Sequence, residues 1–148
     1  MSVKTILAAK GGNIICIEPT ADLAAAAKLL SSHRIGALAV LDAHGRLVGI
    51  LSERDIVRTM ADVGSAALQL PVAQVMTRNV STCDVNDSIS SVVERMTQGK
   101  FRHMPVLQND RLAGMLSVGD VLKSQIETMD EQIRQLESSI VELNLMKL

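Results

Sequence analysis

Hydrophobic residues recur with the same spacing in two stretches of the chain. Ile17–Leu41 and Cys83–Leu107 align when Val40 is placed on Val106, an offset of 106 − 40 = 66. In both stretches apolar residues fall at i, i+3, i+4 and i+7, which places them on one face of an α-helix. Thr20 and Asn86 precede these predicted helices and are expected to be their N-caps. The stripe comprises Leu23, Ala26, Ala27 and Leu30 in the first stretch and Ile89, Val92, Val93 and Met96 in the second.

After each predicted helix come two short apolar segments separated by a polar turn. The turn of the second copy is one residue shorter, so the offset between Gly49 and Gly114 falls to 114 − 49 = 65. Surface turns tolerate such a change, so the pattern indicates two copies of one structural unit. The predicted strands are Ala37–Leu41 and Leu47–Leu51 in the first copy and Met104–Leu107 and Leu112–Leu116 in the second.

Both copies close on a Gly-x-x-Ser-x-x-Asp motif that leads into another predicted helix. The motif occupies Gly49–Asp55 and Gly114–Asp120. Each copy is therefore predicted to run strand, helix, strand, strand, helix. A unit of about 60 residues buries too little surface to be comfortably stable alone. We expect the two copies to pack through their sheets with approximate two-fold symmetry, leaving two related clefts between them.

The order of elements and the doubled motif resemble a tandem pair of cystathionine-β-synthase (CBS) domains, a Bateman module, of the stand-alone bacterial type. The resemblance covers roughly residues 3–125. It implies an α+β (α/β-type sandwich) fold of two β-α-β-β-α repeats related by pseudo-two-fold symmetry, followed by a C-terminal helix. We expect repeat 1 over 3–75, repeat 2 over 76–125, and an amphipathic, coiled-coil-like helix over 126–148.

The Ser-x-x-Asp pairs have a structural and a ligand-binding interpretation. Each fits a helix N-cap followed by an acid at the third helical position. A helix start also offers free N–H groups to a phosphate, and a carboxylate can accept both vicinal hydroxyls of a ribose. The family resemblance favours the second interpretation. It implies that Asp55 and Asp120 anchor ribose, with Ser52 and Ser117 beside them.

The resemblance also implies an adenine ring held between apolar side chains and read by backbone groups. The matching segments are Val80–Thr82, Gly36–Ala37 and Met104–Pro105. The cationic side chains near the first hairpin strand of the second copy differ from those at the matching positions of the first copy. They are either phosphate ligands or ordinary solvated surface. The predicted ligand-binding residues are Ser52, Arg54, Asp55, Ser117, Asp120, Gly36, Ala37, Val80, Thr82, Arg102, His103, Met104 and Pro105.

Composition excludes several classes of partner. Lys and Arg total 15 and Asp and Glu 16, a net charge of −1, which argues against nucleic acid. Phe101 is the single aromatic residue, so bases have no stacking platform. The longest uncharged run, Val63–Thr77, contains two glutamines and a proline and is too short for a membrane span of about 20 residues. We expect a cytoplasmic protein.

The residues that usually carry chemistry are few and scattered. Cys16 and Cys83 both fall in predicted strands and are expected to be buried as small hydrophobes. The three histidines have no metal-ligand spacing, so no metal is expected to be required. No catalytic triad, acid pair or phosphate-cradling loop is recognisable, so an enzyme is not predicted.

The C-terminal segment carries a separate pattern. From Leu122, apolar residues recur in steps of 4, 3, 4, 3, 4 and 3, a heptad seam typical of helix pairing. The alternative is a single amphipathic helix that lies on its own domain. The family resemblance likewise implies a homodimer. The seam continues through Ile126, Met129, Ile133, Leu136, Ile140 and Leu143.

Taken together, the resemblance implies a sensor that binds an adenosine nucleotide (AMP, ADP or ATP) or NAD(H) in the clefts between the repeats. It would act on a separate, unidentified regulated protein, because no catalytic domain is recognisable in the chain. Two alternatives stay open. One is an S-adenosylmethionine sensor, and the other is a structural or oligomerisation protein with no ligand.

Overall fold

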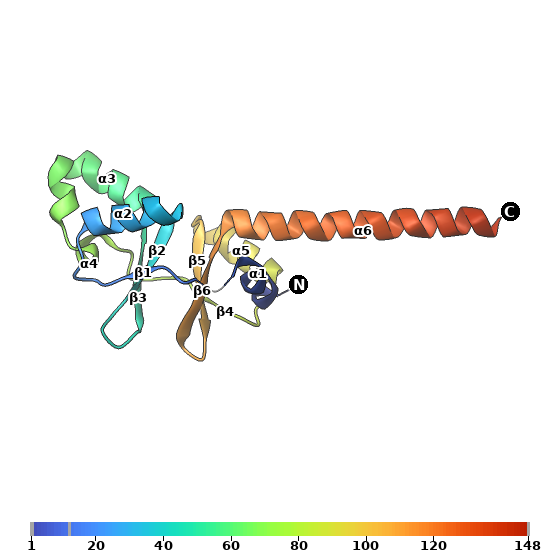
Figure 1. The fold of residues 1–148 in the computed structure, drawn as a ribbon, viewed down its shortest axis with the longest axis horizontal. Coiled ribbons are helices and arrows are strands. Elements are labelled where there is room, and N and C mark those ends of the chain that lie inside the picture. Colours follow the sequence, from blue (N-terminus) through green and yellow to red (C-terminus); the bar gives the residue numbers. More distant parts are fainter. Residues whose placement is uncertain (1, 12, 148) are drawn as a thin grey trace.

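The computed structural model describes residues 2–11 and 13–147. Two three-stranded sheets, each accompanied by helices, form the body of the molecule, and one long helix extends from it (Figure 1). The elements in chain order are α1 (Val3–Lys10), β1 (Cys16–Ile17), α2 (Leu23–His33), β2 (Ala37–Leu41), β3 (Leu47–Ser52), α3 (Glu53–Val63), the 3-10 helix η1 (Gly64–Gln69), α4 (Val72–Val75), β4 (Cys83–Asp84), α5 (Ile89–Gly99), β5 (His103–Gln108), β6 (Arg111–Ser117) and α6 (Val118–Met146).

The two sheets have the same topology. In each, the first strand pairs in parallel with the second, and the second pairs with the third as an antiparallel hairpin. Cys16 lies opposite Ala39 in the first sheet, and Cys83 lies opposite Val106 in the second. The predicted order of strand, helix, strand, strand and helix is confirmed in both copies, as is the pseudo-two-fold α+β architecture.

The hairpin turns account for the change of offset between the copies. The β5–β6 turn consists of Asn109 and Asp110, both with positive φ (52° and 63°), which is the backbone of a two-residue hairpin loop. The β2–β3 turn is longer and has positive φ at Gly45 (76°). The length difference is therefore confined to the hairpin loops.

The apolar stripes of α2 and α5 face the core as predicted, but the predicted caps are wrong. Asp22 caps α2, its Oδ1 accepting from the N–H of Ala25 at 2.9 Å. Ser88 caps α5, its Oγ accepting from the N–H of Ser91 at 3.2 Å. Thr20 and Asn86 lie two residues earlier, in the turns that lead into these helices.

Each copy has its own hydrophobic core, and each core is completed by the segment that precedes the other copy. Val3 and Ile6 of α1 are buried in the core of the second copy. Val72 and Met76, in and just after α4, are buried in the core of the first. Because α1 packs on the second copy, its last residue, Lys10, lies near the second motif.

The two cysteines lie on opposite faces of their sheets, which corrects the expectation that both are buried. Cys83 is buried, whereas Cys16 is exposed. With the 66-residue offset Cys16 matches Thr82, and Cys83 matches Ile17, so the cysteines occupy neighbouring positions of the repeat. Successive strand residues point to opposite faces, and β1 accordingly exposes Cys16 and buries Ile17.

α6 is one continuous helix of 29 residues that extends from the body, and from Met129 to Lys147 every described residue is exposed (Figure 1). Val121 and Ser124 are its buried residues. The heptad seam is exposed along its length, so the alternative in which this helix lies on its own domain is wrong. Within the described part of the chain, no helix combines the length and apolar character that crossing a membrane requires.

Candidate functional site

Two clefts lie where residues of both copies meet. The first, which we term the Asp120 cleft, has a volume of about 540 Å³ and contains the second motif. The other, the Asp55 cleft, has a volume of about 440 Å³ and contains the first motif. Both volumes fall in the range of small-molecule sites, roughly 300–1,000 Å³. Each motif therefore opens onto a cleft that residues of the other copy complete.

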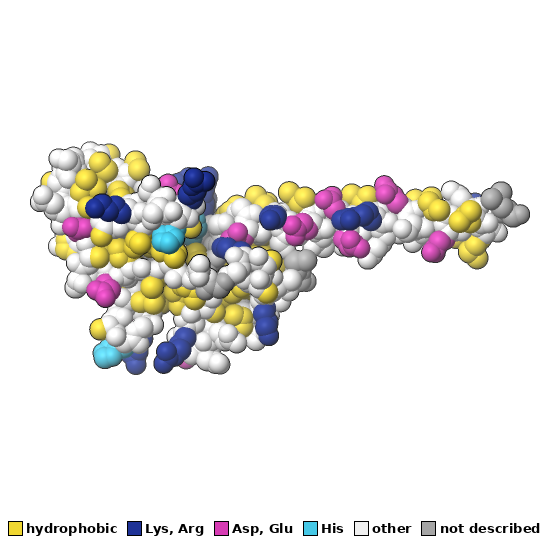
Figure 2. All heavy atoms as spheres, viewed as in Figure 1, with side chains coloured by type: hydrophobic (Ala, Val, Ile, Leu, Met, Phe, Trp, Pro, Cys, Tyr) yellow, Lys and Arg dark blue, Asp and Glu magenta, His cyan; other side chains and the backbone are white. Residues whose placement is uncertain are grey.

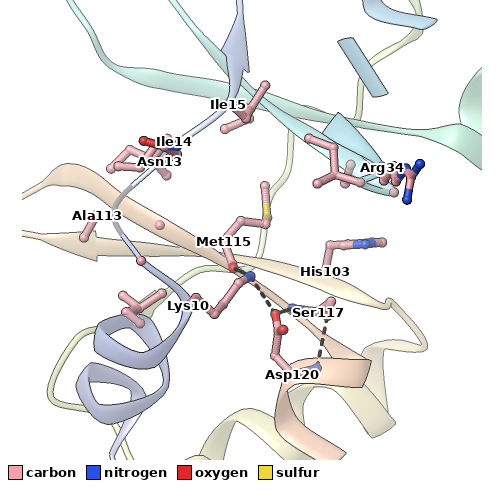
Figure 3. Close-up of a pocket in the computed structure, with 18 residues that line it drawn as sticks. Lys10, Asn13, Ile14, Ile15, Arg34, His103, Ala113, Met115, Ser117 and Asp120 are labelled. Carbon is pink, nitrogen blue, oxygen red and sulfur yellow. Dashed lines mark hydrogen bonds and ion pairs between the residues drawn. The ribbon is translucent and has the colours of Figure 1, made fainter. Parts of the chain in front are cut away.

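The Asp120 cleft has an apolar wall and a polar end (Figure 3). Ile14 and Ile15 come from the segment before β1, and Ala113 and Met115 come from β6. The polar and charged residues that line it are Lys10, Asn13, Arg34, His103, Ser117 and Asp120.

Both motifs form complete capping boxes. The Ser52 N–H donates to Oδ2 of Asp55 at 2.9 Å, and the Asp55 N–H donates to Oγ of Ser52 at 3.3 Å. The corresponding distances for Ser117 and Asp120 are 2.8 and 3.1 Å. The structural interpretation of the motifs is therefore correct for both copies. Each box also fixes one carboxylate at the start of a helix and at the wall of a cleft.

Lys10 reaches the second motif from α1 and neutralises Asp120. Its Nζ donates to Oδ2 of Asp120 and to the carbonyl oxygen of Met115, both at 2.7 Å (Figure 3). Burial raises the pKa of the Asp120 carboxyl, but the hydrogen bonds from Lys10 and from the Ser117 N–H outweigh it, so the pKa lies below its usual value. Both of these donors bind Oδ2 of Asp120. A ligand hydroxyl would therefore meet less competition from them at Oδ1.

Asp55 is held more tightly. Arg58, one helical turn further along α3, donates from Nη2 to Oδ1 of Asp55 at 2.6 Å, while Oδ2 accepts from Ser52. The Asp55 side chain is 9% exposed, against 22% for Asp120. A ligand would therefore reach the Asp120 carboxylate with less rearrangement than the Asp55 carboxylate.

His103 stands between the clefts and lines both of them. A Cβ placed on Gly36 would lie 3.0 Å from Cε1 and Nε2 of this imidazole. Burial lowers the pKa of His103, and the charges of Lys10 and Arg102 add to this, while Glu53 and Asp120 oppose it. The imidazole is therefore largely neutral at pH 7.

Most of the predicted site residues line a cleft. The Asp55 cleft contains Ser52, Arg54, Asp55, Gly36, Val80, Arg102 and His103. The Asp120 cleft contains Ser117, Asp120, Gly36, Ala37 and His103. Three predicted residues are not brought into either wall. Met104 and Pro105 are both fully buried, Met104 in the core of the second copy, and Thr82 uses its carbonyl oxygen to accept from Arg95 at 2.6 Å.

The sequence reasoning missed several cleft residues. Asn13 and Ile14 match Asn79 and Val80 at the 66-residue offset, so the repeat itself could have found them. Arg58 lies three residues after Asp55, a spacing that places both on one helix face. Lys10 had no such signal, because it reaches Asp120 only through the packing of α1 on the second copy. Across residues 2–11 and 13–147, no group of three or more metal-ligating side chains occurs.

Comparison with known proteins identifies the family. The chain matches the family model of the CBS domain twice, over residues 4–62 and 72–127. It is 30% identical over 114 residues to the CBS domain-containing protein YhcV of Bacillus subtilis, covering 76% of this chain and 79% of that protein. Three CBS domain-containing proteins of Arabidopsis thaliana also match, at 28–29% identity, but the matched stretch spans only 22–23% of their length.

Solved structures agree with this match. A CBS-domain containing protein of Agrobacterium tumefaciens is 44% identical, with a TM-score of 0.80 over 84% of this chain and 92% of that one. The CBS domain pair of protein MJ0100, solved in complex with 5-methylthioadenosine and S-adenosyl-L-methionine, is 27% identical. Its TM-score is 0.77 over 86% of this chain and 98% of that one.

Proposed function

The chain belongs to the CBS domain family, and we propose that it is a regulatory module that binds an adenosine-containing ligand in the clefts between its repeats. The observation that carries the proposal is the pairing of each Ser-x-x-Asp carboxylate with a cleft of ligand size. The MJ0100 domain pair, which has this fold, binds two adenosyl compounds. The proposed module works in the cytoplasm on a separate protein and has no catalytic role of its own.

The Asp120 cleft supplies each kind of contact that an adenosine needs. The Asp120 carboxylate would accept the vicinal hydroxyls of a ribose, and Lys10 and the Ser117 N–H both bind Oδ2 rather than Oδ1. Ile14 and Ala113 offer apolar surface to a purine ring. Arg34 and Lys10 supply positive charge for a phosphate.

The charges around the clefts favour a phosphorylated ligand. Arg54, Arg58, Lys100 and Arg102 line the Asp55 cleft, against the acids Glu53 and Asp55. S-adenosylmethionine carries a sulfonium cation, which these side chains would repel. We therefore propose AMP, ADP, ATP or NAD(H) as the ligand class and keep S-adenosylmethionine as the competitor that the MJ0100 pair makes worth testing.

Regulation follows from the Lys10–Asp120 pair. A ribose bound at Asp120 must displace Lys10 or share the carboxylate with it, and Lys10 ends the helix that completes the second core. The ligand can shift the packing of α1 only to the extent that it binds one arrangement more tightly than the other. The proposed output is a changed surface on a homodimer, recognised by the regulated protein.

The competing function is a ligand-free assembly protein. It is favoured by one observation, that both carboxylates already bind their own main chain and a cation. Calorimetric titration with AMP, ATP, NAD and S-adenosylmethionine separates the two. Saturable binding of a phosphorylated ligand supports the sensor, and no heat from any of the four supports the assembly protein.

Conservative variants localise the binding. Asp120→Asn and Asp55→Asn keep an oxygen for the capping N–H but lose the charge that holds ribose. Each should weaken binding in its own cleft at least about tenfold, because hydrogen bonds to charged groups are the stronger ones. Asp110→Asn is the matched control, since Asp110 is exposed in the β5–β6 turn. Unchanged binding in both site variants would contradict the proposed ligand position.

A further inference from the structure

α6 carries an exposed apolar seam that nothing in the body covers. We define the seam as the seven residues that continue the heptad spacing, and their exposed fractions run from 52% to 65%. Figure 2 shows hydrophobic side chains along much of the extended helix. From Met129 to Lys147 every described residue is exposed. The seam consists of Leu122, Ile126, Met129, Ile133, Leu136, Ile140 and Leu143.

We propose that the seam is the interface of a parallel, two-stranded coiled coil formed with α6 of a second copy of this chain. The 4-3 spacing assigns the heptad positions. Every a position from Ile126 to Ile140 is Ile, and the d positions are Leu except for Met129. β-branched Ile at a with Leu at d is the combination that favours two parallel strands over three or four.

The flanking charges favour the parallel orientation. In a parallel pair, each g position faces the following e position of the second copy. Gln125 then meets Asp130, and Gln132 meets Glu137, so no like charges face each other. In an antiparallel pair whose seams overlap along their whole length, Ile126 lies opposite Leu143 of the second copy. Asp130 then lies opposite Glu137, and symmetry repeats this pair of like charges a second time. Like charges at such positions select against that arrangement.

Charge also argues against a membrane surface as the occupant. From residue 123 to its end at Met146 the helix carries five acidic and two basic side chains. Helices that lie on membranes present a polar face rich in Lys and Arg, the opposite bias.

The family match ends at residue 127, so most of the seam is an addition of this chain to the CBS pair rather than part of the ligand-binding module.

Parallel pairing has a consequence for the clefts. Both bodies lie at the same end of the coiled coil, and each Asp120 is in the first turn of the helix that pairs, two residues before Leu122. The base of the coiled coil therefore adjoins both Asp120 clefts. The pairing itself does not depend on ligand binding, so failure of the proposed function leaves it standing and the reverse also holds.

Disulfide trapping tests the pairing and its orientation in the full-length chain. Cys16 is exposed and is first changed to Ser, whereas the buried Cys83 is retained. In this background, Leu143→Cys should oxidise to a covalent dimer, because a parallel register brings the two copies of position 143 together. Leu145→Cys, on the outer face of the same helix, is the matched control and should remain monomeric under denaturing electrophoresis. A disulfide needs Cα atoms within about 7 Å.

Disruption of the seam supplies the second arm. Ile133→Glu with Leu136→Glu should abolish the crosslink at position 143, whereas Gln135→Glu with Ser138→Glu on the outer face should not. All four residues lie beyond the body, so the thermal transition of the body should be the same in both variants. Equilibrium sedimentation of the unmodified chain should give the mass of two chains.

Three different results would contradict the proposed coiled coil. A monomer or a trimer in sedimentation would overturn the proposal. So would a dimer in which Leu143→Cys fails to crosslink, since antiparallel helices separate the two copies of position 143 by about 25 Å. A crosslink that persists in the Ile133→Glu, Leu136→Glu variant would show that the seam does not hold the helices together.

Discussion

Gly36 and His103 face each other across the boundary between the two repeats. A Cβ on Gly36 would come within 3.0 Å of Cε1 and Nε2 of His103 and within 3.1 Å of Oε1 of Glu53. At the 66-residue offset His103 matches Ala37, so the two repeats place side chains of very different size at this position. The imidazole fills space that the missing side chain of Gly36 leaves, and it forms part of the wall of both clefts.

Gly36→Ala should therefore destabilise the protein and weaken ligand binding in both clefts. Overpacking of this kind costs about 1–3 kcal/mol, and the entropy that Ala removes from the unfolded chain returns about 0.4–1 kcal/mol, so we expect a net loss of about 1 kcal/mol. Urea unfolding measures it. His103→Ala should remove the crowding by the imidazole and leave only Oε1 of Glu53 at 3.1 Å, so Gly36→Ala should cost less in that background. Equal effects in both backgrounds would contradict the proposed contact.

Lys10→Met should reduce stability at neutral pH but not at low pH. The folded-state pKa of Asp120 is lowered, so the carboxylate stabilises the fold above its unfolded pKa, and this contribution is lost as pH falls through the folded value. Part of it comes from the Lys10 ion pair, which is partly exposed and therefore contributes about 1 kcal/mol or less.

Urea unfolding at pH 7, 5 and 3 measures this difference, and NMR titration of the carboxyl should show a higher pKa for Asp120 in the variant. Lys4→Met is the control, because Lys4 is exposed on the same helix. A Lys10→Met penalty that is the same at pH 3 and pH 7 would show that Lys10 acts through packing rather than through the Asp120 charge.

The capping box of the first motif and the ion pair of Asp55 with Arg58 should make separable contributions to the free energy of unfolding. Asp55→Ala leaves the Ser52 N–H without its acceptor and should cost about 1–2 kcal/mol in urea unfolding. Asp55→Asn retains an oxygen for that N–H and should cost less. Arg58→Ala should cost under about 0.5 kcal/mol, because the Arg58 side chain is largely exposed. If Arg58→Ala were the most damaging of the three, the ion pair and not the cap would hold this site together.

The two thiols should differ sharply in reactivity. Burial raises the pKa of Cys83 to about 11, so its reactive thiolate is scarce at pH 8, whereas Cys16 is exposed. A disulfide reagent such as DTNB should titrate one thiol per chain rapidly in the native protein and two in denaturant. Cys16→Ser should remove the rapid phase, and Cys83→Ser should leave it. Two rapid thiols in the native protein would contradict the placement of Cys83 in the core.

The sequence was sufficient for the repeat and its elements because the spacing of apolar residues is a local property. The strand Ala37–Leu41 was predicted with its observed bounds, and the stripes of α2 and α5 face the cores. The sequence also contains the signal for the observed caps, since Asp22 and Ser88 directly precede the first apolar residue of each helix. The exposure of Cys16 also has a signal in the sequence, because the offset puts the two cysteines at neighbouring repeat positions and hence on opposite faces.

Other features of the site depend on tertiary packing, which the repeat pattern does not contain. Lys10 reaches Asp120 because α1 joins the core of the second copy, 110 residues away in the chain. Met104 and Pro105 matched a family segment, but Met104 lies in the core of the second copy and Pro105 beside it is fully buried. The contact of His103 with Gly36 arises from the way the two repeats meet, which a comparison of one repeat with the other does not reveal.

A crystal structure with the ligand that binds most tightly in the titrations tests the central claim most directly. We predict ribose hydroxyls within about 2.5–3.0 Å of the Asp120 carboxylate, with the Ser117 N–H still bound to Oδ2 and Lys10 displaced or turned toward a phosphate. A ligand that lay outside both clefts, while Asp55 and Asp120 kept only their bonds to their own motif, Arg58 and Lys10, would contradict the proposed binding of ribose.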